Sequence, residues 1–224
     1  MSATSQASRT PGPAAAGAGS RRWLALAVLA AMQFMLTMDV TVVTVALPKI
    51  EVTLHFSHAD LAWVVNGYVL MAGGFLLLGG RLSDLFGRRR LFFTGVLIFG
   101  IASAACGAAV SQSMLIASRF VQGTGEALAA PAALGMIPVL FPDSLERTKA
   151  LGIWGGIAGL GGMSGVVISG ALTGLLSWRW IFYINIPVVV FALLMVPRVL
   201  AESRPAARGS HRLDVFGANL CERR

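Results

Sequence analysis

Six long runs of apolar residues, separated by short polar or glycine-containing breaks, account for most of the chain. They cover residues 23–47, 60–80, 91–110, 114–140, 150–175 and 179–200. An α-helix rises about 1.5 Å per residue, so about 20 apolar residues cross the hydrocarbon core of a bilayer. Each run is long enough for one crossing. The pattern predicts an all-α membrane protein built as a six-transmembrane-helix bundle.

The two ends of the chain differ from this apolar region. Residues 1–22 are rich in alanine, serine, proline and glycine, a composition that buries too little apolar surface to order itself, so we expect a disordered cytoplasmic tail. Residues 201–224 are basic and polar, and we expect a second cytoplasmic tail there. The first run, at about 25 residues, is long for the apolar part of a signal peptide, which favours a retained helix. The bundle is therefore expected to occupy residues 23–200.

Composition supports the membrane class and narrows the partners. Hydrophobic residues make up 56% of the chain, charged residues only 12%, and the mean hydropathy is +0.74, which excludes soluble and disordered classes. The net charge of +8 would suggest nucleic acid in a soluble chain, but here basic residues flank apolar runs and suit anionic lipid headgroups. We therefore expect the lipid bilayer as a partner, and no nucleic acid. Cys106 and Cys221 lie in a span and a tail, which argues against a disulfide framework.

Basic residues are distributed unevenly between the two sides of the predicted bundle. With the amino terminus inside, only Lys49 and Arg179 fall outside and Arg119 falls within a run, while every other lysine and arginine lies inside. Positive residues mark the loops that stay in the cytoplasm. The distribution predicts a multi-pass protein of the cell membrane with both termini cytoplasmic. It also predicts a tight inner turn at residues 81–90.

That inner turn contains ordered glycines and an acid as well as arginines. The segment resembles the G-x-L-x-D-x-x-G-R-[KR] signature of the major facilitator superfamily, in the loop where that family carries it, through Gly80, Leu82, Asp84, Gly87, Arg88 and Arg89. The resemblance implies a cytoplasmic gate that holds the inner side closed in one state and releases it in another. The alternative interpretation is a solvated basic turn that only sets orientation.

The first apolar run contains an aspartate. The segment LTMDVTVVTVALPKI resembles the first helix of the fourteen-span drug:proton antiporter branch through Asp39, Thr41 and Ala46-Leu47-Pro48, although Thr44 stands where that branch often has asparagine. A charged carboxylate alone in a bilayer costs several kcal/mol, so by default it faces a cavity or a partner. The resemblance implies that Asp39 carries protons. The alternative is an aspartate that reaches the interface.

The fourth run contains an arginine. The segment LIASRFVQGTGEALAAPAALG resembles the family signature L-x-x-x-R-x-x-Q-G-x-G-x-A, through Leu115, Arg119, Gln122, Gly123, Gly125 and Ala127. Arg119 offers a permanent positive charge that favours the ionised form of a nearby carboxylate. Glu126 stands where the family usually has a small residue; it could pair with Arg119, form a second titrating site or face the lipid interface. Asp39, Arg119 and Glu126 are thus the candidates for proton coupling, and we expect Asp39 and Arg119 to share a wet cleft.

The fifth run is rich in glycine. The segment GLGGMSGVVISGALTG resembles the antiporter signature G-x-x-x-G-P-x-x-G-G through Gly161, Gly165 and Gly170, but Val166 and Ser169 replace a proline and a glycine. Small residues at four-residue spacing allow helices to approach closely. We therefore interpret this segment as a helix-packing motif.

The resemblance covers only one half of the family fold. It implies the amino-terminal bundle, made of two inverted three-helix repeats whose first helices carry Asp39 and Arg119 and line the central cavity. The implied function is proton-coupled efflux of small, drug-like molecules, with the proton as coupling ion and no cofactor. The chain is expected to be truncated after the sixth run, and to need a second copy of itself or a carboxy-terminal half as partner.

Two functions other than transport are each suggested by a feature of the sequence. A non-transporting membrane fragment or scaffold is compatible with a half-length bundle. An intramembrane serine protease is suggested by Ser164 in a G-x-S-G context, but a serine nucleophile needs a base. The three histidines, His55, His58 and His211, lie in loops or the tail, so we expect no enzyme activity.

Overall fold

The chain forms a bundle of long helices whose boundaries follow the apolar runs. The computed structural model describes residues 13–200, with side chains from residue 19. Its elements are α1 (Pro13–Leu54), α2 (His58–Gly74), α3 (Leu76–Phe86), α4 (Arg88–Gly107), α5 (Gln112–Leu140), α6 (Ser144–Leu175), α7 (Trp180–Tyr183) and α8 (Asn185–Val199). Three of these helices are capped at their amino ends by polar side chains. Ser57, Ser111 and Asp143 accept hydrogen bonds from first-turn amides of α2, α5 and α6, respectively.

The described helices provide up to six candidate membrane crossings, as many as the sequence predicts. Five helical segments of residues 19–200 are each long and apolar enough to cross a membrane, and α7 and α8 together form the last of them. The sixth is the pair α2 and α3, bent by 46° at Phe75. Gly73 and Gly74 precede the bend, and glycine pairs weaken a helix at such points.

The first helix begins earlier than the sequence predicted. Residues 1–22 were expected to be disordered, but α1 starts at Pro13. Proline suits the first position of a helix because its missing N–H would have no partner there, and the alanines that follow are strong helix formers. Residues 1–12 and the predicted tail at 201–224 lie outside the described residues.

The inner turn is shorter than the predicted segment 81–90. Helix α3 continues to Phe86 and α4 starts at Arg88, so a single residue, Gly87, forms the turn. Its φ of 96° lies in the region that favours glycine. The polar side chains expected in a loop therefore project from the last turn of one helix and the first turn of the next.

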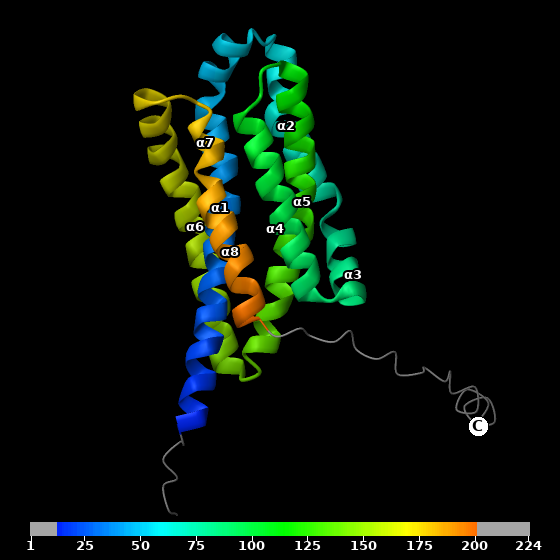
Figure 1. Cartoon of the computed structure of the whole chain (residues 1–224), viewed down its shortest axis with the longest axis vertical. Helices are drawn as coiled ribbons and strands as arrows, with labels where there is room; N and C mark the ends of the chain where they lie inside the picture. The colour runs from blue at the N-terminus through cyan, green and yellow to red at the C-terminus, as the bar shows by residue number, and fades with distance from the viewer. Residues whose placement is uncertain (1–12, 201–224) are drawn as a thin grey trace, which may run out of the picture.

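The packing of the six spans follows the two expected three-helix units. The first span, α1, packs along the fifth, α6, and the fourth, α5, packs along the second, α2 with α3. An inverted repeat relates the first, second and third spans to the fourth, fifth and sixth. Under this relation, the contact between the first and fifth spans corresponds to the contact between the fourth and second spans, and both contacts are present. In Figure 1, α6 lies at one edge of the bundle and α3 at the opposite edge.

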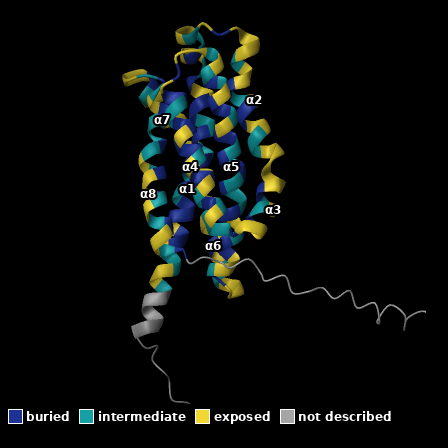
Figure 2. Ribbon diagram, turned by 45° about the vertical axis from the view of Figure 1, so that its right-hand side comes forward, coloured by how far each residue is buried: buried dark blue, intermediate teal, exposed yellow. Residues whose placement is uncertain are grey.

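Burial separates the inner faces of the helices from the outer ones. Figure 2 shows buried residues where helices meet and exposed residues on the outer faces. Many exposed side chains are large and apolar, including Leu77 and Leu175, each 84% exposed. Outward-facing apolar side chains are what a lipid-facing bundle presents.

Candidate functional site

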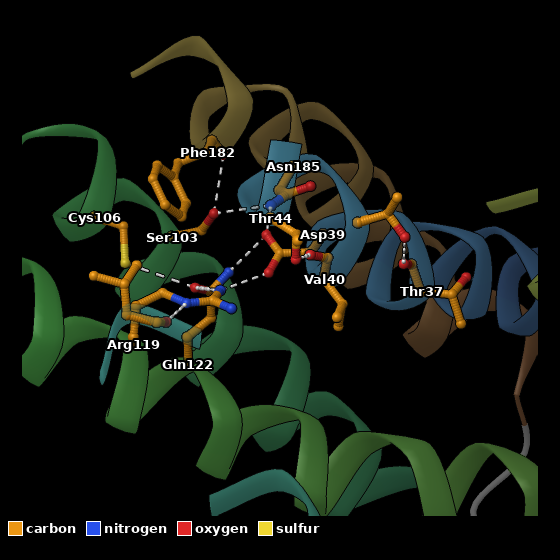
Figure 3. A network of polar contacts seen from close by, with 12 residues as sticks. Thr37, Asp39, Val40, Thr44, Ser103, Cys106, Arg119, Gln122, Phe182 and Asn185 are labelled. Carbon is orange, nitrogen blue, oxygen red and sulfur yellow. Dashed lines mark hydrogen bonds and ion pairs between the residues drawn. The ribbon is translucent and has the colours of Figure 1, made fainter. Parts of the chain in front are cut away.

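The centre of the bundle contains a buried ion pair between the two residues singled out in the first and fourth runs. Asp39 projects from α1 and Arg119 from α5, and Arg119 Nη1 lies 2.6 Å from Asp39 Oδ2. Both side chains have 0% exposure. Figure 3 shows the two groups facing one another inside a wider polar network. The structure thus brings together residues that are 80 positions apart in the sequence.

The second carboxylate oxygen of Asp39 is held by two amides. Its Oδ1 accepts hydrogen bonds from Asn185 Nδ2 at 2.7 Å and from Gln122 Nε2 at 3.1 Å. The Gln122 carbonyl oxygen in turn accepts from Arg119 Nη1 at 2.8 Å. Helices α1, α5 and α8 therefore meet at one carboxylate, and its charge is stabilised by three donors.

The guanidinium of Arg119 is held from the side of α2. Its Nε donates to the carbonyl of Val64 at 2.9 Å, and its Cζ lies 4.0 Å from the centre of the Tyr68 ring. A cation over an aromatic face is attracted by the ring quadrupole. Arg119 Nη2 has no hydrogen-bond partner within the described residues. The guanidinium is therefore fixed in place while one of its donors remains available.

Asn185 is oriented by a hydroxyl on α4. Its Nδ2 donates to Ser103 Oγ at 3.1 Å, and Ser103 donates to the carbonyl of Phe182 at 2.9 Å. The Asn185 Oδ1 has no partner among residues 19–200. The chain of contacts extends from α1 through α8 and α4 to α7, so a change at Asp39 has a direct route to the last span.

A carboxylate buried beside a permanent cation can couple a proton to the arrangement of helices. Removing two charges from water is expensive, and attraction offsets this only while the pair stays together. A proton on Asp39 would cancel its charge and leave the Arg119 cation buried without its counter-ion. Protonation would therefore favour an arrangement of the helices in which Arg119 finds another partner or water.

The exposure of the Asp39–Arg119 pair to water differs from the expectation. Asp39 and Arg119 were expected in a wet cleft, but both side chains are fully enclosed. Tyr68 from α2, itself 1% exposed, covers the guanidinium, and the amides of α5 and α8 cover the carboxylate. The sequence shows that charges need partners in a bilayer, but it does not show which neighbours exclude water.

Glu126, the third candidate for proton coupling, does not pair with Arg119. Its half-buried carboxyl lies beside the hydroxyl of Tyr68, near the Asp39–Arg119 pair. It forms no ion pair among the described residues. Of the roles left open by the sequence, pairing with Arg119 is therefore not observed in this conformation.

Three residues of the network were missed at the level of sequence: Tyr68, Ser103 and Asn185. Asn185 had a detectable signal, since it is an isolated amide in the apolar segment INIPVVVFALL. Polar side chains in such a setting need a partner. Ser103 and Tyr68 gave no such signal in the sequence, because serine and tyrosine also occur in apolar helices without a functional role.

The residues of the predicted cytoplasmic gate lie at the turn between α3 and α4. Asp84 Oδ1 is 3.1 Å from Arg88 Nη2, and Arg88 also donates to the carbonyl of Gly135 on α5. Arg89 Nη2 lies 3.4 Å from the carbonyl of Pro197 on α8. Gly80 lies one turn before Asp84, on α3. The motif therefore ties the ends of α3, α4, α5 and α8 together, which is more than a solvated turn would do.

The glycines of the fifth run divide into two groups. A Cβ atom on Gly161 would lie 2.5 Å from the carbonyl oxygen of Phe34, and one on Gly165 would lie 2.9 Å from Cβ of Thr41. Both glycines therefore allow α6 to approach α1 closely. Gly170 has nothing within 4 Å of such an atom in the described part of the chain, so it makes no comparable contact.

The alternative chemistries gain no support from side-chain placement. Ser164 donates to the carbonyl of Gly161 within its own helix at 3.1 Å, and His58 lies 3.1 Å from Glu51 in a different element. No cluster of three or more metal-ligating side chains occurs in residues 19–200. The expectation that no cofactor is used stays a prediction.

Comparison with known proteins places the chain in a family. The family profile of the Major Facilitator Superfamily matches residues 29–222. The chain is 44% identical over 204 residues to the puromycin resistance protein pur8 of Streptomyces alboniger, covering 91% of this chain and 40% of that protein. It is 40% identical over 220 residues to the lincomycin resistance protein of Streptomyces lincolnensis, with 96% and 44% coverage. It is 42% identical over 196 residues to the cephamycin export protein CmcT of Amycolatopsis lactamdurans, with 88% and 40% coverage.

A solved structure shares the fold. A bacterial homologue of the human lysosomal transporter Spinster, in an inward-facing and unoccupied conformation, superposes with a TM-score of 0.74 at 22% identity and covers 88% of this chain and 48% of that one. The chain spans about two-fifths of the length of the curated relatives named above. The fold, the signatures and these matches agree that this integral membrane chain belongs to the Major Facilitator Superfamily.

Proposed function

We propose that this chain is the proton-binding half of a transporter that exports small, drug-like molecules in exchange for protons. The observation that carries the proposal is the enclosed pair of Asp39 and Arg119, where one titratable group meets one permanent charge. Resistance and export are named for the relatives described above, which supports efflux as the direction of transport. The proposal includes no catalytic step.

The network suggests how a proton could be exchanged for cargo. With Asp39 ionised, its carboxylate holds α1, α5 and α8 together through three donors. A proton on Asp39 weakens all three contacts, because a neutral acid accepts hydrogen bonds less strongly than a carboxylate. The helices would then separate more readily and open the centre of the bundle. Return of the proton to water would restore the closed arrangement.

The orientation in the cell membrane is also a proposal. The start of α1, the turn between α3 and α4, the turn between α5 and α6, and the end of α8 lie at one end of the bundle (Figure 1). The basic residues of the segments that meet there, among them Arg22, Arg88 and Arg198, favour a cytoplasmic location for that end. Lys49 and Arg179 lie near the opposite end, in the second half of α1 and just before α7.

A complete carrier would need a second bundle. Alternating access in this architecture involves two bundles that move about a shared site. We propose that the second bundle is either another copy of this chain or the carboxy-terminal half found in longer relatives. Chemical crosslinking and light scattering of the purified chain would distinguish a dimer from a monomer.

The proposal is tested by transport in proteoliposomes with an imposed pH gradient, using the chain with and without a co-expressed carboxy-terminal half. Asp39→Asn is expected to abolish gradient-driven transport while membrane insertion stays normal. Asp60→Asn, at an exposed position at the start of α2, serves as the matched control. Gradient-driven transport by Asp39→Asn at the unaltered rate would remove Asp39 from the mechanism. Failure of every combination to move any substrate would favour the scaffold alternative.

A further inference from the structure

A cavity of about 390 Å³ lies between the carboxyl ends of α1 and α6, at the end of the bundle opposite the turn between α3 and α4. Its walls come from the last turns of α1, from the end of α6 and from the turn that follows α6. They include Lys49, Val52, Thr53, Leu176, Ser177 and Trp178. The cavity therefore combines one charge, two hydroxyl groups, an indole ring and apolar side chains.

Lys49 is the one charged side chain in the walls of this cavity, among the residues that the structure describes. Its Nζ donates a hydrogen bond to the carbonyl of Thr173 in the last turn of α6, where backbone carbonyls lack partners within the helix. Lys49 forms no ion pair within residues 19–200. An ammonium group has three donors, so two remain for an incoming group.

The charged groups around Lys49 leave the cavity positive. The guanidinium of Arg179 lies 4.5 Å from the centre of the Trp178 ring, and Arg179 also has no ion pair among the described helices. Glu51 is two positions after Lys49, where side chains of a helix do not face one another, and it pairs with His58 at 3.1 Å. A group that enters the cavity therefore meets uncompensated positive charge, which favours an anion.

The position of Lys49 along α1 matches the depth of lipid headgroups. Lys49 is ten residues after Asp39, which corresponds to about 15 Å along the helix axis. Half of the hydrocarbon core of a bilayer is also about 15 Å thick. With Asp39 at the centre of the bundle, Lys49 lies at the boundary between hydrocarbon and headgroups. Trp178 agrees with this depth, because tryptophan is enriched at that boundary.

The rim of the cavity is apolar and faces outward. Val52 is 75% exposed and Leu176 is 60% exposed. A soluble anion would use the charge of Lys49 and leave these side chains bare, whereas a lipid also covers them with its acyl chains. A zwitterionic lipid brings a positive group as well, which Lys49 and Arg179 repel. The lining therefore fits a lipid whose headgroup is negative overall.

We propose that this cavity binds the phosphate of an anionic phospholipid, and that Lys49 is the residue that holds the phosphate. The acyl chains of this lipid lie along Val52 and Leu176, so that one lipid molecule bridges the ends of α1 and α6. Binding of the lipid requires no proton coupling, so it goes beyond the proposed transport function and is tested separately from it.

The chain contains its own control for the test, because Lys49 and Lys149 are its only lysines. Lys149 lies near the start of α6, at the other end of the bundle, with its Nζ 5.7 Å from the centre of the Trp23 ring. The purified wild-type chain in uncharged detergent micelles is acetylated with an N-hydroxysuccinimide ester, and each lysine is read by mass spectrometry. Phosphatidylglycerol is expected to protect Lys49 saturably and to leave Lys149 reactive, whereas phosphatidylcholine protects neither.

Glycerol 3-phosphate distinguishes a lipid site from a site for soluble anions, because it carries the phosphate without acyl chains. It is expected to leave Lys49 reactive at concentrations at which phosphatidylglycerol protects it fully. Equal protection of Lys49 by glycerol 3-phosphate would overturn the assignment of a lipid. Absence of protection by phosphatidylglycerol, or equal protection of Lys49 and Lys149, would overturn the site itself.

A second measurement is the affinity for the first bound phosphatidylglycerol, obtained by native mass spectrometry. Lys49→Gln is expected to weaken this affinity about tenfold or more, because charge-assisted hydrogen bonds to the phosphate are lost, and Lys49→Arg is expected to retain it. Lys149→Gln removes the same charge from the other end of the bundle and should bind as the wild type does. An unchanged affinity in Lys49→Gln, or an equal loss in Lys149→Gln, would contradict the proposed role of Lys49.

Discussion

Replacement of Arg119 by methionine removes the permanent charge from the centre of the bundle and keeps a side chain of similar length. The Asp39 carboxylate then stays buried without its counter-ion. Two further hydrogen bonds are lost, to Gln122 Oε1 at 2.8 Å and to the Val64 carbonyl at 2.9 Å. The pair has 0% exposure on both sides, so solvent does not screen the charge that remains.

The size of the effect follows from these contacts. Breaking a buried pair by removing one partner costs about 3–5 kcal/mol, and the lost hydrogen bonds place Arg119→Met in the upper part of that range. Asp39→Asn removes the charge but keeps an oxygen that accepts from Gln122 and Asn185. The double variant Asp39→Asn/Arg119→Met therefore contains no buried unpaired charge. We expect it to recover at least about 2 kcal/mol of the loss in the single Arg119 variant.

The assay is reversible unfolding in mixed micelles, followed by tryptophan fluorescence, for the wild type, both single variants and the double variant. A double-mutant cycle gives the coupling free energy directly. Losses that add without coupling would mean that the two charges do not stabilise one another. An Arg119→Met variant as stable as the wild type would refute the reasoning altogether, because it would show that Asp39 tolerates burial alone.

Three further perturbations test other parts of the structure. Asn185→Leu removes a donor to the Asp39 carboxylate and is expected to lower the free energy of unfolding by about 1.5–3 kcal/mol. The control Asn66→Leu, at an exposed position of α2, should change it little. Equal losses in the two variants would contradict a special role for Asn185. Gly161→Ala forces α6 away from α1 and is expected to lower the free energy of unfolding by about 1–3 kcal/mol in the same assay. The control is Gly159→Ala, whose added Cβ has no described atom within 4 Å; it should be neutral or stabilising. Gly87→Ala places a Cβ at a φ of 96° and is expected to lower the thermal midpoint through about 1–2 kcal/mol of strain, an effect that would be absent if α3 and α4 were joined by a flexible loop.

The order of the helices could be predicted because the bilayer simplifies the problem. A run of about 20 apolar residues has few alternatives to a membrane-spanning helix, and the basic residues then fix which ends lie together. The bend at Phe75 and the extension of α3 to Phe86 were less accessible. The bend follows Gly73 and Gly74, and glycines occur in many straight apolar runs as well. The end of α3 contains polar residues such as Asp84, and helical structure there needs no apolar run.

The candidate site could be predicted in part. Asp39 and Arg119 stood out because a charged side chain in an apolar run needs a partner, and the two carry opposite charges. Asn185 offered a signal as an isolated amide in an apolar run, but Tyr68 and Ser103 offered none, because the role of each depends on the direction in which its side chain points. Their directions are set by contacts between helices that are distant in the sequence, and the periodicity of one helix carries no information on its neighbours.

The central claim is that Asp39 gains and loses the proton that controls the bundle. Infrared difference spectroscopy of the chain in membranes, between neutral and acidic buffer, detects the carbonyl band of a newly protonated buried carboxyl group. We predict that acidification of the wild type produces such a band, that Asp39→Asn lacks the Asp39 part of it while any part from Glu126 remains, and that Asn185→Leu shifts the frequency of the Asp39 part because one hydrogen bond to that carboxyl is gone. A spectrum of Asp39→Asn identical to that of the wild type would contradict the account.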